Sequence, residues 1–278
     1  AVGGHGHNVV LDRVKDALTT LVTHERCRGI GVSPDCSPTS ALLCLPDGPS
    51  MLFNLEHVDG IPNLSMRDAR RQADALAMYQ ACADIVTSLH ASATTTSKCL
   101  WWEGPVGRGS DSVFAIPGQE QHSSMFHITC VRDALHACSS RPVYFDQQPL
   151  GAASPKTTVV YGSPDILPHL DELLGNTPLA VPDGSRSTVG FNEQQQSKAS
   201  ALKRYPLGMR VRLATAMLRT LHAADGSQVG GVDDDVSVMH SMHTTDETVL
   251  NTPGESEDGS PITHSEFMQA IEAAADVM

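Results

Sequence analysis

Long hydrophobic runs and nucleotide-binding loops are both missing from this chain of 278 residues. A membrane-spanning helix needs roughly 18 or more consecutive apolar residues, and no window approaches that length, so we expect no membrane contact. No basic segment followed by an apolar run opens the chain, so we expect no secretory signal. Neither common type of glycine-rich phosphate-binding loop occurs.

Closely spaced cysteine pairs are also missing. The seven cysteines are odd in number and scattered, which predicts free thiols and a reducing, intracellular compartment. The thirteen histidines show no zinc-type spacing with them. Since the chain starts at Ala1, we expect removal of an initiator Met or of a longer targeting segment.

Basic residues are lacking at the end of the chain, where no Lys or Arg follows Arg219. The tail from Asp225 onward holds twelve of the 32 acidic residues, which leaves 20 acids against 19 Lys and Arg in the rest. The body is therefore nearly neutral and the tail is acidic. Clustered basic residues are needed to neutralise phosphates, so the charge pattern gives little support to a nucleic-acid binder.

Apolar periodicity predicts a helix over 10–25 and a second helix that begins at Ser65, with Asp68 as its capping-box partner, and runs to about His90. Over 28–54 we predict a strand, a sharp turn and two further strands, with a hairpin around Pro46-Asp47-Gly48-Pro49. The other predicted elements are strands at 99–102 and 142–145, possible strands at 158–161 and 179–181, and a loop at 104–121. Helices are predicted at 125–138, 166–174, 199–222, 236–243 and 263–278.

This order predicts an α/β fold with a mixed sheet flanked by helices. We divide the chain into an N-terminal arm and helix (1–27), a first part of the core (28–150), an insertion (151–198), a last part of the core (199–244) and an acidic extension with a linker and terminal helix (245–278).

Three segments carry a resemblance to a known family. They are Gly29-Ile-Gly-Val-Ser-Pro-Asp-Cys-Ser-Pro-Thr-Ser-Ala-Leu-Leu43, Leu100-Trp-Trp-Glu-Gly104, and Met209 to Leu221 followed by Gly231-Val-Asp-Asp-Asp-Val236. In order and spacing they resemble the RuvC-type Holliday-junction resolvases, closest to the chloroplast branch. The resemblance implies an RNase H-like fold and a site where carboxylates hold two Mg²⁺ ions for phosphodiester cleavage.

By this resemblance the catalytic and metal-binding positions are 33, Glu103, and Asp233 and Asp235 beside Asp234. Position 33, where the family has a carboxylate, is Ser33, and a neutral hydroxyl cannot replace a bridging carboxylate. Asp35 lies two residues on, past Pro34, and is the alternative first ligand. The family spaces its last two acids three apart, which the Asp233–Asp235 run does not reproduce.

Plainer interpretations stay open for each feature. Glu103 can be a strand-end acid that faces water, and the Asp233–Asp235 run can be helix N-terminal acids stabilised by the helix dipole. The basic residues before and along the 199–222 helix are candidates for phosphate contact or for a solvated helix face. They are Lys203, Arg204, Arg210, Arg212 and Arg219.

Three functional hypotheses follow. The first is a catalytically degenerate RuvC-like protein that associates with DNA or RNA and acts as a scaffold in a larger complex, such as an organellar ribonucleoprotein or a ribosome-assembly particle, with mitochondria as the expected compartment. The second is an active Mg²⁺-dependent junction endonuclease that uses Asp35, Glu103 and the aspartate run. The third is a non-catalytic domain that docks to protein subunits through its acidic tail.

Overall fold

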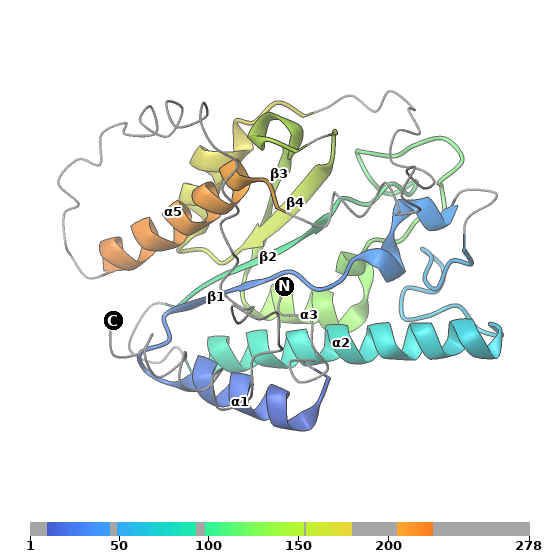
Figure 1. The fold of residues 1–278 in the computed structure, drawn as a ribbon, viewed down its shortest axis with the longest axis horizontal. Coiled ribbons are helices and arrows are strands. Elements are labelled where there is room, and N and C mark those ends of the chain that lie inside the picture. The colour runs from blue at the N-terminus through green and yellow to red at the C-terminus, as the bar shows by residue number, and fades with distance from the viewer. Residues whose placement is uncertain (1–9, 45–48, 93–97, 153, 180–204, 225–278) are drawn as a thin grey trace, which may run out of the picture.

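A four-stranded mixed sheet with the strand order β1-β2-β4-β3 organises the chain (Figure 1). The computed structural model describes residues 10–44, 49–92, 98–152, 154–179 and 205–224. β1 (Gly29–Val32) runs parallel to β2 (Cys99–Pro105), and β4 (Thr157–Gly162) pairs antiparallel with both β2 and β3 (Arg141–Asp146). This arrangement confirms the predicted α/β class and mixed sheet.

The parallel pair β1–β2 needs a long crossover, and α2 (Met66–Ala91) supplies it. α2 begins as predicted: the Ser65 hydroxyl accepts from the Asp68 amide at 3.1 Å and donates to its carboxylate at 2.9 Å. None of the helices among the described residues is long and apolar enough to cross a bilayer.

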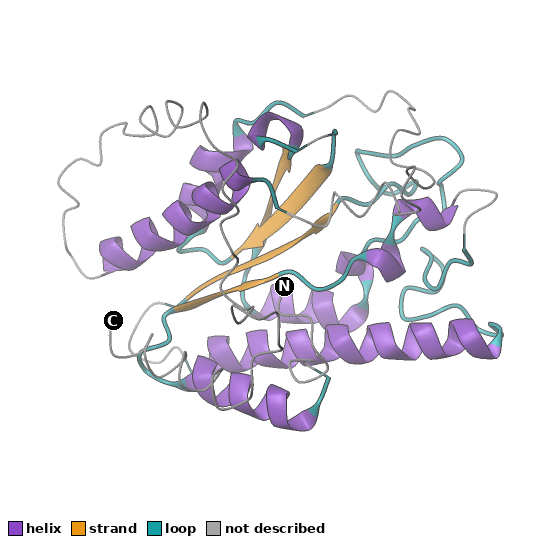
Figure 2. Cartoon of the chain, viewed as in Figure 1, coloured by secondary structure: helices purple, strands orange, loops and turns teal. Residues whose placement is uncertain are grey.

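Helices cover both faces of the sheet (Figure 2). On one face α1 (Asp12–Thr23), α2 and α3 (Thr129–Ala137) enclose a core that includes Leu100 and Trp102 of β2. On the other face lie α4 (Leu167–Leu170), the π-helical turn η6 (Asp171–Gly175) and α5 (Leu207–Ala224). β2 side chains alternate between these two cores, as strand geometry requires.

A close approach fixes β1 against β2. A Cβ on Gly31 would lie 2.1 Å from the Trp101 ring, and a Cβ on Gly29 would lie 2.4 Å from the Cys99 sulfur. The two glycines therefore leave the α5 side of β1 bare, and side chains of β2 fill that space.

The predicted hairpin between β1 and α2 is wrong. Instead of strands, two 3-10 turns, η2 (Ser37–Thr39) and η3 (Ala41–Cys44), follow β1, and residues 51–53 belong to no strand. Residues 45–48, which include most of the predicted hairpin turn, lie outside the described residues. Leu52 and Phe53 are nevertheless buried in the α2-side core. The Leu52 carbonyl accepts from the Ile61 amide at 3.0 Å and from Gln72 of α2 at 2.7 Å, so it is satisfied without a hairpin partner.

The segment 151–198, predicted as an insertion, contributes part of the sheet itself. Its predicted strand forms as β4, which lies between β2 and β3 and is buried on both faces. β-branched residues at 157–160 suit such a central position. Leu179 is not in a strand, and residues 180–198 lie outside the described residues, as do 199–204 and the helices predicted at 236–243 and 263–278.

Candidate functional site

The parallel pairing of β1 and β2 brings position 33 next to Glu103. The register places Val32 opposite Trp102, so the next positions along the two strands are Ser33 and Glu103. The Ser33 hydroxyl donates to Glu103 Oε2 at 3.0 Å. The structure therefore joins the two positions that the resemblance put at the centre of the site, although Glu103 lies inside β2 and not at its end.

Glu103 is buried, with 4% of its surface exposed, and its carboxylate is surrounded by donors. Tyr205, just before α5, contacts both Ser33 and Glu103 Oε2 through its hydroxyl. On the other oxygen, Gln147 Nε2 lies 3.4 Å from Oε1, and Lys156 Nζ lies 3.9 Å from it. Gln147 also donates to the Thr158 hydroxyl at 2.9 Å. We call Ser33, Glu103, Gln147, Lys156 and Tyr205 the Glu103 cluster.

In the Glu103 cluster the negative charge of the carboxylate is balanced by groups of the protein itself. Burial raises the pKa of Tyr205, and the negative charge of Glu103 raises it further, so the phenol keeps its proton and remains a donor. Burial also raises the pKa of the neighbouring Cys36 thiol, although the Lys156 charge opposes that shift. One buried carboxylate therefore faces one ammonium and neutral donors, which is how a buried charge is tolerated.

Asp35 takes no part in this cluster. Its Oδ1 accepts from the Ser37 amide at 3.0 Å and from the Ser37 hydroxyl at 2.6 Å, so its carboxylate closes a local turn. Its backbone carbonyl accepts from the Tyr79 hydroxyl of α2 at 3.0 Å. The alternative first ligand predicted from the sequence is thus committed to shaping the chain after β1.

The predicted basic cluster is only partly described, and its described members lie on two faces of α5. Lys203 and Arg204 lie outside the described residues. Arg210 is exposed on α5, whereas Arg212, two residues on and therefore about 200° around the helix, donates to the Leu173 carbonyl. Arg219 pairs with Glu172 at 2.9 Å. Of the described members of this cluster, Arg210 is exposed, and Arg212 and Arg219 are partly exposed.

The residues around Glu103 do not fit a Mg²⁺ ion. Mg²⁺ binds hard oxygen ligands, mainly carboxylates and water, but the described neighbours of Glu103 are an ammonium, an amide donor and two hydroxyls that contact its carboxylate. Over the described ranges no group of three or more His, Cys, Asp or Glu side chains is placed to hold a metal. Asp233 and Asp235 lie outside those ranges.

Sequence reasoning missed three members of the cluster: Gln147, Lys156 and Tyr205. Gln147 directly follows β3 and Lys156 directly precedes β4, so the antiparallel pairing of those strands delivers both to one end of the sheet. A signal was available in principle, since polar residues at paired strand ends meet at one edge. Tyr205 carried no such signal, because it arrives from a different segment ahead of α5.

A second polar group joins the 104–121 loop to the turn before α3. His127 lies 3.3 Å from Asp111 through Nε2 and 3.3 Å from the Ser123 hydroxyl through Nδ1. The residue types match a Ser-His-Asp nucleophilic triad, but Ser123 is only 1% exposed, which closes it to a substrate. This group anchors the loop.

Comparison of the chain with known protein families, with curated proteins and with solved structures finds no match.

Proposed function

We propose that this protein is a catalytically degenerate member of the RuvC-like type, which acts as a scaffold component of a larger nucleic-acid-containing assembly. The observation that carries the proposal is the Glu103 cluster: the position of the metal-binding carboxylate is kept, but its oxygens are taken by Ser33, Tyr205, Gln147 and Lys156. A nuclease needs that carboxylate free for metal ions.

The parallel β1–β2 pair and the crossover helix α2 also support the proposal, because they place positions 33 and 103 side by side as the resemblance implies. The single strand before α2 departs from the RNase H-like layout, in which three strands precede the first helix. The proposed relationship therefore rests on the site and its flanking strands.

The deciding experiment measures the stability of Glu103→Gln in urea, with and without millimolar Mg²⁺. In a working metal site, removing a carboxylate leaves the metal-free protein equally or more stable, because functional carboxylates repel one another. In the Glu103 cluster the same change removes the charge that Lys156 faces and replaces one acceptor oxygen by an NH₂ group, which is itself a donor among four donors. We therefore expect a loss of about 2 kcal/mol whether or not Mg²⁺ is present.

A cleavage assay on four-way DNA junctions with Mg²⁺ gives the second readout. We expect no cleavage by the wild type and none by Ser33→Asp, because the restored carboxylate would meet the Tyr205 hydroxyl while Lys156 still faces Glu103. Wild-type cleavage that Glu103→Gln abolishes would overturn the degenerate assignment and establish a metal-dependent endonuclease.

The nucleic-acid part of the proposal is tested by gel shift with single- and double-stranded DNA and RNA at low salt. Arg210→Glu should weaken binding, whereas Arg132→Glu, an exposed position on α3 at the opposite face of the sheet, should not. Absence of binding to every one of these nucleic acids would restrict the scaffold to protein partners.

A further inference from the structure

We infer that a groove between α2 and α3 is a docking site for a basic amphipathic helix of a partner protein. The inference deepens the proposed scaffold role and rests on it for the existence of protein partners. The groove lies on the α2 side of the sheet, whereas Tyr205 reaches Glu103 from the α5 side, so the two sites are separate surfaces of the molecule.

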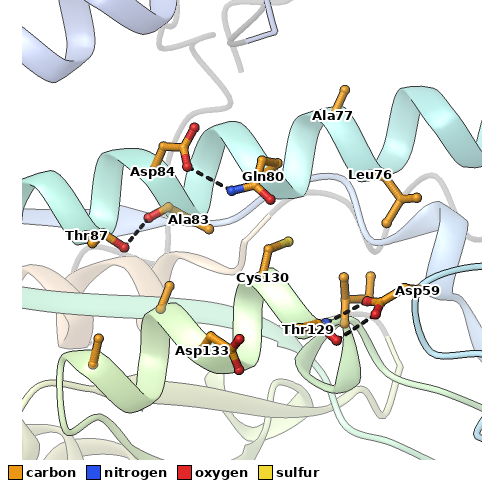
Figure 3. A pocket seen from close by; sticks show the side chains of 13 residues that line it. Asp59, Leu76, Ala77, Gln80, Ala83, Asp84, Thr87, Thr129, Cys130 and Asp133 are labelled. Carbon is orange, nitrogen blue, oxygen red and sulfur yellow. Dashed lines mark hydrogen bonds between the residues drawn. The ribbon is translucent and has the colours of Figure 1, made fainter.

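The groove has the form that an α-helix needs. It encloses about 780 Å³ and is lined by α2, by α3 with the turn before it, and by Asp59. Its α2 wall runs from Leu76 to Thr87, which is about 16 Å at 1.5 Å per residue, or three helical turns. Figure 3 shows the two helices side by side with Cys130 between them.

The lining is apolar and made mostly of small side chains. Leu76 is the larger apolar lining residue that is partly exposed, whereas Ile128 is fully buried beneath the groove. The small apolar residues are Ala77, Ala83, Ala134 and Ala137. Small side chains keep both walls low, which lets a partner backbone approach closely while its own larger apolar side chains enter the groove. This is the helix-in-groove mode, which is read by apolar anchors at i, i+3 or i+4, and i+7.

The acidic residues that line the groove, which we call its rim, indicate the charge of the partner. Three lining residues are acidic, Asp59, Asp84 and Asp133, and none of the described lining residues is Lys, Arg or His. Asp59 also accepts from the Thr129 amide at 2.8 Å and so caps α3, and Asp84 pairs with Lys15 at 2.5 Å. Asp133 is exposed and contacts its neighbour Arg132. A helix with Lys or Arg beside its apolar face complements this rim, and the same rim repels a phosphate backbone.

The test uses a synthetic helical peptide of about 15 residues, long enough to span the groove, with Leu and Ala on one face and Lys on both flanks. Its binding to the full chain is followed by fluorescence anisotropy. We expect a Kd of about 10 µM, and a much weaker complex when Glu replaces the flanking Lys. Equal binding of the Lys and Glu peptides, or no binding of the Lys peptide, would overturn the inference.

Matched variants locate the site. Ala137→Trp fills the groove from an exposed position, and His136→Trp places the same bulk on the adjacent exposed position of α3, which does not line it. Asp133→Lys reverses a rim charge, and Asp74→Lys makes the same change on α2 away from the groove. We expect the Kd to rise at least about tenfold for the two groove variants and to stay unchanged for the two controls.

Two other results would also count against the inference. A concentration-dependent dimer that Ala137→Trp abolishes would make a second copy of this chain the occupant. Binding that survives both groove variants would place the peptide elsewhere. If the peptide does not bind in the groove, the Glu103 stability and cleavage results are unaffected. If the protein shows Mg²⁺-dependent cleavage, the proposed function is wrong but peptide binding can still be measured. The two failures are therefore distinguishable.

Discussion

Two buried charged side chains five residues apart, Lys98 and Glu103, are neutralised in different ways. Lys98, 8% exposed, precedes β2 and donates to the carbonyls of Val22 at 2.9 Å and His24 at 3.2 Å, and to the Ser92 hydroxyl at 2.9 Å. It thereby binds the carbonyl end of α1, where the helix dipole favours a cation. Glu103 is instead held by side chains from four separate segments.

The difference separates a charge that the backbone holds from a charge that side chains hold. Two of the three partners of Lys98 are backbone atoms, which no substitution removes, so its site is a consequence of where α1 ends. Each partner of Glu103 is a side chain that a single substitution changes. The Glu103 cluster is therefore the place where the identity of the residues, more than the path of the backbone, decides what the site does.

The largest effect on the free energy of unfolding is expected at Lys98. Lys98→Met removes the donor to the buried Val22 carbonyl and to the partly buried His24 carbonyl, and we expect the free energy of unfolding in urea to fall by about 3 kcal/mol. Lys15→Met, which removes a half-exposed ion pair with Asp84, is the control and should change stability little. Equal effects of the two variants would remove the distinction between the sites.

A double-mutant cycle between Glu103 and Lys156 sharpens the comparison. Glu103→Gln and Lys156→Met each leave the other charge without its partner, so the double variant should be more stable than the sum of the single losses predicts. We expect a coupling of about 1–2 kcal/mol in urea unfolding, tempered by the 3.9 Å separation of the two groups. A coupling near zero would mean that Lys156 does not neutralise Glu103.

A smaller loss of stability is expected when the Tyr205 hydroxyl is removed. Tyr205→Phe removes the hydroxyl that contacts Ser33 and Glu103 but keeps the ring, so we expect about 1 kcal/mol of destabilisation. Tyr144→Phe, at an exposed position of β3, serves as the control for removal of a tyrosine hydroxyl. A thermal or urea midpoint shared by Tyr205→Phe and wild type would show that the hydroxyl adds nothing to the cluster.

The smallest effect on stability is expected at His122, a buried side chain that, in contrast to Lys98 and Glu103, is neutral. It accepts from the Arg108 amide through Nδ1 at 2.9 Å, and its Nε2 lies 3.0 Å from the Thr39 carbonyl, an arrangement that suits the neutral ring. Burial lowers the pKa of His122 below its ordinary 6.5, so its contribution to stability is complete above that pH and is lost as the pH falls.

We therefore expect the wild type to lose more unfolding free energy between pH 7 and pH 5 than His122→Gln does, by roughly 1 kcal/mol or less. Urea unfolding of both proteins at a series of pH values measures this difference. Parallel pH profiles would contradict the assignment of a neutral, buried ring.

Local sequence signals predicted much of the fold. The Ser65–Asp68 capping box, the apolar run of β2 and the β-branched run of β4 each depend on neighbours in the chain, and each formed. The hairpin failed because Leu52 and Phe53 are buried by packing under α2 with a glutamine side chain as backbone partner, and apolar composition alone does not distinguish that from a strand.

Only the two central residues of the Glu103 cluster could be predicted from the sequence. Ser33 and Glu103 follow from two motifs on strands that the crossover makes neighbours. Lys156, Gln147 and Tyr205 reach Glu103 through the β3–β4 pairing and the position of α5, which are long-range outcomes of packing. Asp35, the alternative ligand candidate, lies outside the Glu103 cluster, because the amide and hydroxyl of Ser37, two residues away, donate to its carboxylate.

The bare glycine side of β1 has a consequence for how this protein can change over generations. Along β1, the glycines at positions 29 and 31 have no side chain on the α5 side. Ser33, which follows β1, is therefore the first residue with a side chain on that side, and this side chain contacts Glu103 and Tyr205. A substitution at 33 therefore alters the chemistry of the cluster without disturbing the neighbouring packing of β1. The packing of β1 and the chemistry of the Glu103 cluster are thus uncoupled at one position.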